Sequence, residues 1–206
     1  MRSSADAGRA WAALAALLAL GSALAFALGA DPHLLDWQPA LAWREPSRAW
    51  SAVFVHFSAL HLGANAAGAA LVGALGWVAR VPRRSVVAWF VAWPLTQFGL
   101  LVRPDLLHYG GLSGVLHAGV ACAALCLIVA GTGSRRVIGW VVLAGLVAKV
   151  IGEAPWGDAL RHPPEWDIAV APVAHASGLV AGLLAAALGE ALHRRRRSEL
   201  SARARP

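Results

Sequence analysis

Six apolar segments, each near the length of a membrane-spanning helix, constrain this chain more than any other feature. They lie at 10–30, 52–79, 85–102, 112–131, 136–153 and 171–191. A helix needs about 17 to 25 mostly apolar residues to cross a bilayer. Five of the segments contain an uncharged run of that length, and the remaining one, at 136–153, continues through Lys149. The sequence therefore predicts an all-α polytopic membrane protein, with residues 1–206 forming one six-helix domain.

The charged residues predict how this domain is oriented. The chain is 58% hydrophobic and only 14% charged, and its formal net charge is +7. A nucleic-acid-binding domain would gather such charge on one folded face. Here 13 of the 18 basic residues instead lie between or beyond the apolar segments, on the side that the positive-inside rule assigns to the cytoplasm, and 8 of the 11 acidic residues fall on the other side. We expect both termini in the cytoplasm, a basic cytoplasmic tail at 193–206, a lipid bilayer as partner, and no nucleic acid.

The first apolar segment has two interpretations, because a basic start followed by an apolar run also describes a secretory signal peptide. Such peptides have an apolar core of about 7 to 15 residues. The run at 10–30 is longer. We interpret it as a retained span.

The two cysteines do not indicate a bound group. Cys122 and Cys126 lie four residues apart within the fourth segment. A membrane helix is a poor place for a structural disulfide, and two thiols alone do not make a metal site. We expect them to serve packing, and we expect no metal and no cofactor.

Polar side chains within three of the apolar segments mark the candidate site. His61 and Asn65 are one helical turn apart, Ser113 lies in the fourth segment, and His175 in the sixth. Polar groups at membrane depth are costly and by default mark a functional site that faces the bundle interior. Serine with histidine is the minimum for an activated hydroxyl nucleophile, and His61 and Asn65 can donate hydrogen bonds to an oxyanion. The pattern predicts a serine protease that works inside the membrane.

Glycines lie next to both proposed catalytic residues. Gly111 and Gly114 flank Ser113 at the expected start of a helix, where backbone N–H groups are free. Gly178 and Gly182 form a small-xxx-small pattern, which lets two membrane helices touch closely. Such packing would bring the two catalytic side chains within hydrogen-bond reach. No Asp or Glu occupies the expected buried positions, so we expect a Ser–His dyad and not a triad.

The whole pattern resembles the rhomboid family of intramembrane serine proteases. The resemblance covers nearly the whole chain and is carried by three ordered motifs, at 56–65, 111–114 and 174–182. It implies a rhomboid-like bundle with Ser113 as nucleophile and His175 as general base. It also implies an oxyanion hole made of His61, Asn65 and the backbone N–H of Ser113, with His56 as a supporting polar residue.

Within that family, the chain is most similar to the rhombosortases. The similarity lies in the segment 109–117 and in the pair Lys149 and Glu153. It implies a substrate that is an exported, membrane-anchored protein with a C-terminal tail: a Gly-Gly-type motif, one membrane helix and a basic end. The enzyme would cut near the glycines, in the cell (inner) membrane, from an active site that opens to the periplasmic or outer side.

Two residue roles stay open at this point. His117 stands where many rhomboids have a tyrosine four residues after the nucleophile. It would either orient His175 or a water molecule, or perturb the dyad. Lys149 would either pair with Glu153 and help a substrate tail to dock, or extend its amine to the membrane surface.

Other functions compete with the sorting-tail protease. One is a general rhomboid protease that cuts other helices, and another is a rhomboid-like protein that binds helices without cutting them. A small transporter would carry more paired charges at mid-membrane than these segments have. Nothing in the sequence indicates an oligomeric state.

Overall fold

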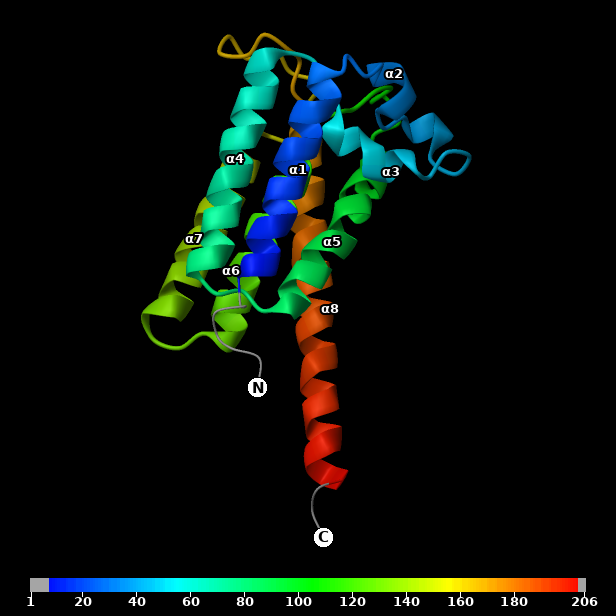
Figure 1. Cartoon of the computed structure of the whole chain (residues 1–206). Coiled ribbons are helices and arrows are strands. Elements are labelled where there is room, and N and C mark those ends of the chain that lie inside the picture. Colours follow the sequence, from blue (N-terminus) through cyan, green and yellow to red (C-terminus); the bar gives the residue numbers. More distant parts are fainter. Residues whose placement is uncertain (1–7, 204–206) are drawn as a thin grey trace.

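The computed structural model describes residues 8–203 and is a bundle of long helices, with extended connections at 28–58 and 153–171 (Figure 1). The long helices are α1 (Arg9–Ala27), α4 (Ala59–Val78), α5 (Arg83–Phe98), α6 (Ser113–Ala130), α7 (Ser134–Gly152) and α8 (Pro172–Arg203). The connections contain the short helices α2 (Pro32–Leu35) and α3 (Arg48–Ser51) and the 3-10 turns η2 (Pro39–Leu41), η3 (Ala52–Phe54) and η4 (Gly99–Val102). Within the described range, extended backbone pairs only at two isolated bridges, Trp37 with Tyr109 and Arg161 with Val170.

Five of the described helices are long and apolar enough to cross a membrane: α1, α4, α5 together with η4, α6 and α8. This confirms the prediction of an α-helical, membrane-embedded protein. The remaining long helix, α7, has 19 residues, and its three charged side chains, Arg135, Arg136 and Lys149, set it apart from these five. It packs against α6 and α8, behind α4 in the view of Figure 1.

The long helices alternate in direction. α4 and α8 begin at the upper end of the bundle in Figure 1, whereas α1, α5 and α7 begin at its lower end. The basic loop positions Arg80, Arg83, Arg135 and Arg136 lie where helices turn at that lower end. Basic residues therefore gather at the lower end of the bundle, and the side of the membrane that this end faces stays a prediction.

The second predicted span, 52–79, is longer than the helix that forms there. Ala52–Phe54 is a 3-10 turn, and α4 begins only at Ala59. The reason is a helix cap: Ser58 has extended backbone angles, and its Oγ accepts a hydrogen bond from the backbone N–H of His61 at 3.0 Å. The cap starts the helix directly before the predicted oxyanion residues.

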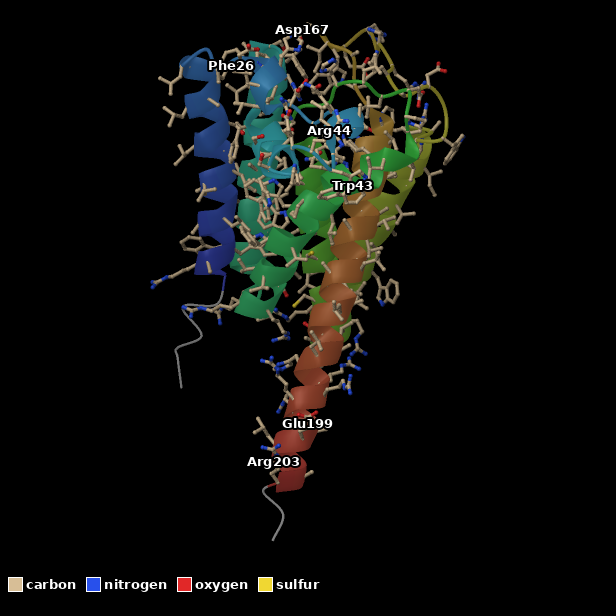
Figure 2. All side chains as sticks on the ribbon, turned by 90° about the vertical axis from the view of Figure 1, so that its right-hand side faces the viewer. Phe26, Trp43, Arg44, Asp167, Glu199 and Arg203 are labelled. Atoms are coloured by element: carbon tan, nitrogen blue, oxygen red, sulfur yellow. The ribbon has the colours of Figure 1, made fainter. Side chains whose placement is uncertain are left out.

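The predicted basic tail, 193–206, is not separate from the sixth span. α8 continues without a break through Arg203, and residues 204–206 lie outside the described range. At about 1.5 Å per residue, its 32 residues extend well past the other helices, with Glu199 and Arg203 near the projecting end (Figure 2). The run of arginines at 194–197 suits helix as well as coil, because arginine has a high helix propensity.

The helices α6 and α8 touch backbone to backbone. A Cβ atom at Gly178 would collide with the carbonyl oxygen of Gly114, and one at Gly182 would collide with that of Ala118. The small-xxx-small pattern predicted such a contact, and the structure shows that its partner is α6. Because α6 is also the most enclosed of the five candidate spans, this contact lies at the centre of the bundle.

We predict that Gly178→Ala destabilises the protein. The added methyl group has no room unless α6 and α8 separate, and overpacking of this kind typically costs about 1–3 kcal/mol. Thermal unfolding in detergent measures the change. Gly145→Ala on α7 is the matched control, because a Cβ there meets nothing within 4 Å. Equal stability of both variants would contradict the close contact.

Candidate active site

Ser113 is the first residue of α6, at the end of a loop that is held on both sides. Trp37 and Tyr109 exchange two backbone hydrogen bonds of 2.7 and 2.8 Å, and the N–H of Gly111 donates to the carbonyl oxygen of Ala52 at 2.9 Å. Gly111 has φ = +125°, a value that L-residues with side chains rarely adopt. This glycine lets the chain turn into α6 and places the serine hydroxyl at the helix start.

His175, in the first turn of α8, faces this hydroxyl. Its Nε2 lies 3.0 Å from the Oγ of Ser113, and its Nδ1 lies 2.6 Å from Oε2 of Glu153. A carboxylate accepts hydrogen bonds, so Nδ1 carries the proton and Nε2 presents its lone pair to the serine. The three side chains form a hydrogen-bonded chain in the order hydroxyl, imidazole and carboxylate, which is the order that a nucleophile, a base and an orienting acid would take.

The expectation of a Ser–His dyad without an acidic partner is therefore wrong. Glu153 follows the last residue of α7, and its side chain turns toward α8. Burial raises the pKa of Glu153, but the hydrogen bond and charge of His175 and the charge of Lys149 outweigh burial and lower it to about 2. The carboxylate is thus ionised at neutral pH and can hold the Nδ1 proton of His175.

Lys149 forms the predicted pair with Glu153, whereas its part in docking a substrate tail stays a prediction. Its Nζ donates to Oε1 of Glu153 at 2.6 Å and lies 3.3 Å from Nδ1 of His175. The backbone carbonyl of Glu153 accepts a further hydrogen bond from Nη1 of Arg161 at 2.8 Å. These contacts leave Oε2 of the carboxylate directed at the histidine.

The contact of Glu153 with His175 was not predicted from the sequence, because the spacing of Glu153 from Lys149 fits an ordinary ion pair along one helix. Glutamate and lysine four residues apart are neighbours on a helix surface and form an ordinary ion pair there, whereas Glu153 is 22 residues from His175. A signal was present in the sequence: the only lysine of the chain and a lone glutamate share the outer end of an apolar segment.

His61 and Asn65 lie beside the backbone that leads to the nucleophile. A Cβ atom built at Gly111 would be 2.7 Å from Nε2 of His61 and 3.8 Å from Nδ2 of Asn65. Only a glycine leaves room for both side chains. Both are buried on the inner face of α4, so two side-chain donors approach the region where an oxyanion on the substrate of Ser113 would form.

His56 holds Asn65 in this position. Burial lowers the pKa of His56, which keeps the ring neutral. Its Nδ1 donates to the carbonyl oxygen of Phe54 at 3.3 Å, and its Nε2 accepts from Nδ2 of Asn65 at 3.1 Å. One amide hydrogen of Asn65 is therefore fixed on the histidine, and the other remains free to bind a ligand.

His117 packs against His175. Its Nδ1 donates to the carbonyl oxygen of Ser113 at 2.7 Å, one turn earlier in α6. The rings of His117 and His175 are stacked, with centroids 4.2 Å apart and planes at 11°. The stacked ring of His117 therefore covers one face of the His175 ring, and the hydrogen bond from Nδ1 to Glu153 holds the ring at its edge. Together these two contacts restrict its rotation. This geometry favours the orienting role for His117 over its alternatives.

The three-residue chain opens into a cavity of about 690 Å³, whose walls include Ser113, His175, His61 and Glu153. The loop 154–171 covers its outer side and contributes Trp166 and Val170 among others. This loop is tied to the start of α4 by Oγ of Ser58, which donates to Oδ1 of Asp167 at 2.7 Å. Asp167 lies at the end of the bundle opposite Glu199 and Arg203 (Figure 2).

No protein-family model and no curated protein matches this chain. The functional assignment rests on the motifs and on the geometry of these side chains.

We predict that Glu153→Gln slows the reaction of Ser113 with a fluorophosphonate probe by on the order of 10²- to 10⁴-fold. The amide can donate to Nδ1 and so favours the tautomer in which Nε2 carries the proton. Labelling rates of the purified protein in detergent measure the effect. Glu165→Gln, in the wall of the same cavity, is the control and should react like the wild type. Equal rates for both variants would remove Glu153 from the site.

Proposed function

We propose that this protein is an intramembrane serine endopeptidase of the rhomboid type. One observation carries the proposal: Oγ of Ser113, the ring of His175 and the carboxylate of Glu153 form a hydrogen-bonded chain. That chain faces a cavity inside a bundle of apolar helices. Serine hydrolases of unrelated folds share this order of groups.

The first half of the proposed reaction forms an acyl-enzyme. Nε2 of His175 takes the proton from Ser113 as its Oγ attacks a backbone carbonyl carbon of the substrate. The developing oxyanion accepts hydrogen bonds from His61, Asn65 and the backbone N–H of Ser113. The imidazolium then gives the proton to the leaving amine, and the peptide C–N bond breaks. Glu153 stays ionised and stabilises the imidazolium.

The second half releases the acyl group. A water molecule loses a proton to Nε2 of His175 and attacks the ester carbonyl carbon, and the proton returns to Oγ of Ser113 as the ester bond breaks. Water therefore has to reach the cavity, which supports an opening near the loop 154–171 and not toward lipid.

We further propose that six helices cross the membrane, with α7 as the fifth span, and that both termini are cytoplasmic. The alternating helix directions and the basic lower end of the bundle support this topology. In the cell (inner) membrane, the catalytic groups would then lie nearer the periplasmic or outer face.

The proposed substrate is a membrane-anchored protein with a C-terminal Gly-Gly-type sorting tail. The resemblance of 109–117 and of Lys149 with Glu153 to rhombosortases supports this choice. Glycines also favour cleavage physically, because a scissile backbone must leave its helix, and glycine is a poor helix former. A general rhomboid protease would accept other helices with small or helix-breaking residues.

We predict that Ser113→Ala abolishes cleavage of a reporter that ends in Gly-Gly, an apolar helix and arginines. The nucleophile is lost, while the cavity is hardly changed. Mass spectrometry of the reporter from co-expressing membranes locates the cut. Ser198→Ala, at the projecting end of α8, is the control and should cleave normally.

Cleavage of a generic rhomboid substrate but not of the tail reporter would favour the general protease. Cleavage of neither by folded wild type would favour a non-cleaving helix binder.

We predict that Asn65→Asp lowers kcat by about 10²- to 10³-fold and leaves KM nearly unchanged. The aspartate keeps the size of the side chain but removes a donor that acts only in the transition state. Initial rates over a range of reporter concentrations separate the two constants. A change confined to KM would place Asn65 in substrate binding instead.

A further inference from the structure

A second cluster of metal-binding side chains lies outside the candidate active site. His33, Asp36 and His108 each offer one ligand atom, and the three atoms lie within 4.8 Å of one another. The carboxylate of Asp36 is only 1% exposed, whereas both histidines are open to solvent. None of the three takes part in the proposed reaction. We propose that these side chains bind one Zn²⁺ ion.

The backbone that carries the three ligands is fixed in advance. Nη1 of Arg48 donates to the carbonyl oxygens of His33 at 2.8 Å and Asp36 at 3.1 Å. The two backbone hydrogen bonds between Trp37 and Tyr109 hold His108 next to Asp36, although the two residues are 72 positions apart. Metal affinity gains when ligands need little reorganisation, and here two distant segments are already joined.

The Asp36 carboxylate has the orientation expected of a metal ligand. Its Oδ1 accepts hydrogen bonds from Nε2 of Gln38 at 2.8 Å and Nη1 of Arg48 at 3.2 Å. Its Oδ2 faces Nδ1 of His108 at 2.7 Å. Ligating carboxylates are commonly held in this way, with outer donors on one oxygen and the metal on the other.

The His33 ring completes the group. It lies edge-on to the ring of His108, with centroids 5.4 Å apart, and its nitrogens have no hydrogen-bond partner within residues 8–203. A ring on fixed backbone with free nitrogens is available as a ligand. Binding would replace the proton between Asp36 and His108, and metal ligation by histidine requires such deprotonation.

Local charge and ligand type together favour Zn²⁺. The positive charge of Arg48 is balanced by Glu45, which accepts from its Nε at 2.5 Å, so the negative charge of Asp36 remains for a cation. Two imidazoles and a carboxylate suit zinc, whereas Ca²⁺ and Mg²⁺ prefer sites made of oxygen ligands. Three protein ligands leave a coordination position for water.

The ion would link the first outer segment to the loop that precedes the nucleophile. His108 adjoins Tyr109 in that loop and lines the same cavity as Ser113. Bound metal would therefore hold one wall of the cavity. The inference does not rest on the proposed protease function, because none of its ligands belongs to the Ser113 chain.

The test is a titration of the full-length protein in detergent with Co²⁺, followed by competition with Zn²⁺. The Ser113→Ala variant serves as the parent, so that the result is independent of catalysis. We expect visible absorption bands of tetrahedral cobalt that saturate at one ion per chain and disappear on addition of zinc. His33→Ala and His108→Ala should each weaken binding by about tenfold or more.

Two controls make the titration decisive. His162→Ala, an exposed histidine of the loop 154–171, should bind like the parent. His33→Ala should unfold at the parent's temperature in the presence of a chelator, because its ring makes no hydrogen bond. Absence of saturable binding by the parent, or equal binding by parent, His33→Ala and His108→Ala, would overturn the proposal.

Discussion

The close contact between α6 and α8 is the interaction on which the candidate site depends. Ser113 opens α6 and His175 lies in the first turn of α8, so the spacing of these helices sets the distance between the two side chains. Gly114 and Gly178 bring the backbones together at the level of the site. In a bilayer, such contact gains dispersion energy but no hydrophobic energy. Only small residues allow the helices to approach this closely.

The site also illustrates how polar groups are kept inside an apolar bundle. Two pairs of polar side chains near Ser113 join different parts of the chain: His56 with Asn65, and Glu153 with His175. Pairing of this kind reduces the cost of burial. Nδ1 of His61 is an exception, since it is buried without a partner. The other ring nitrogen of His61, Nε2, is the one that lies beside Gly111 and would face the proposed oxyanion.

The sequence predicted the helical class, the approximate spans and most of the residues that gather at the site. Those predictions succeeded because they rest on the length of apolar segments and on the spacing of small residues. Both are properties of a single helix and can be taken directly from its sequence. Glu153 was misjudged because its partner lies on another helix, and no periodicity relates the two. The span predicted at 52–79 began too early. The cap at Ser58 starts α4 inside an apolar run that continues on both sides of it, so hydropathy alone does not show where the helix begins. The cluster of His33, Asp36 and His108 depends on a backbone bridge between loops, which composition cannot reveal.

The unbroken length of α8 has a mechanical consequence. His175 stands at one end of a single helix, and the arginines at 194–197 stand near the other, beyond the lower end of the bundle (Figure 2). The glycine contact with α6 lies between them, close to the histidine. α8 also packs against both α5 and α6, and Oε1 of Glu190 accepts a hydrogen bond from Nε of Arg84 at 2.6 Å. The projecting basic end and the turn that carries His175 therefore belong to one continuous rod, so a load on the arginines would be transmitted along the helix axis.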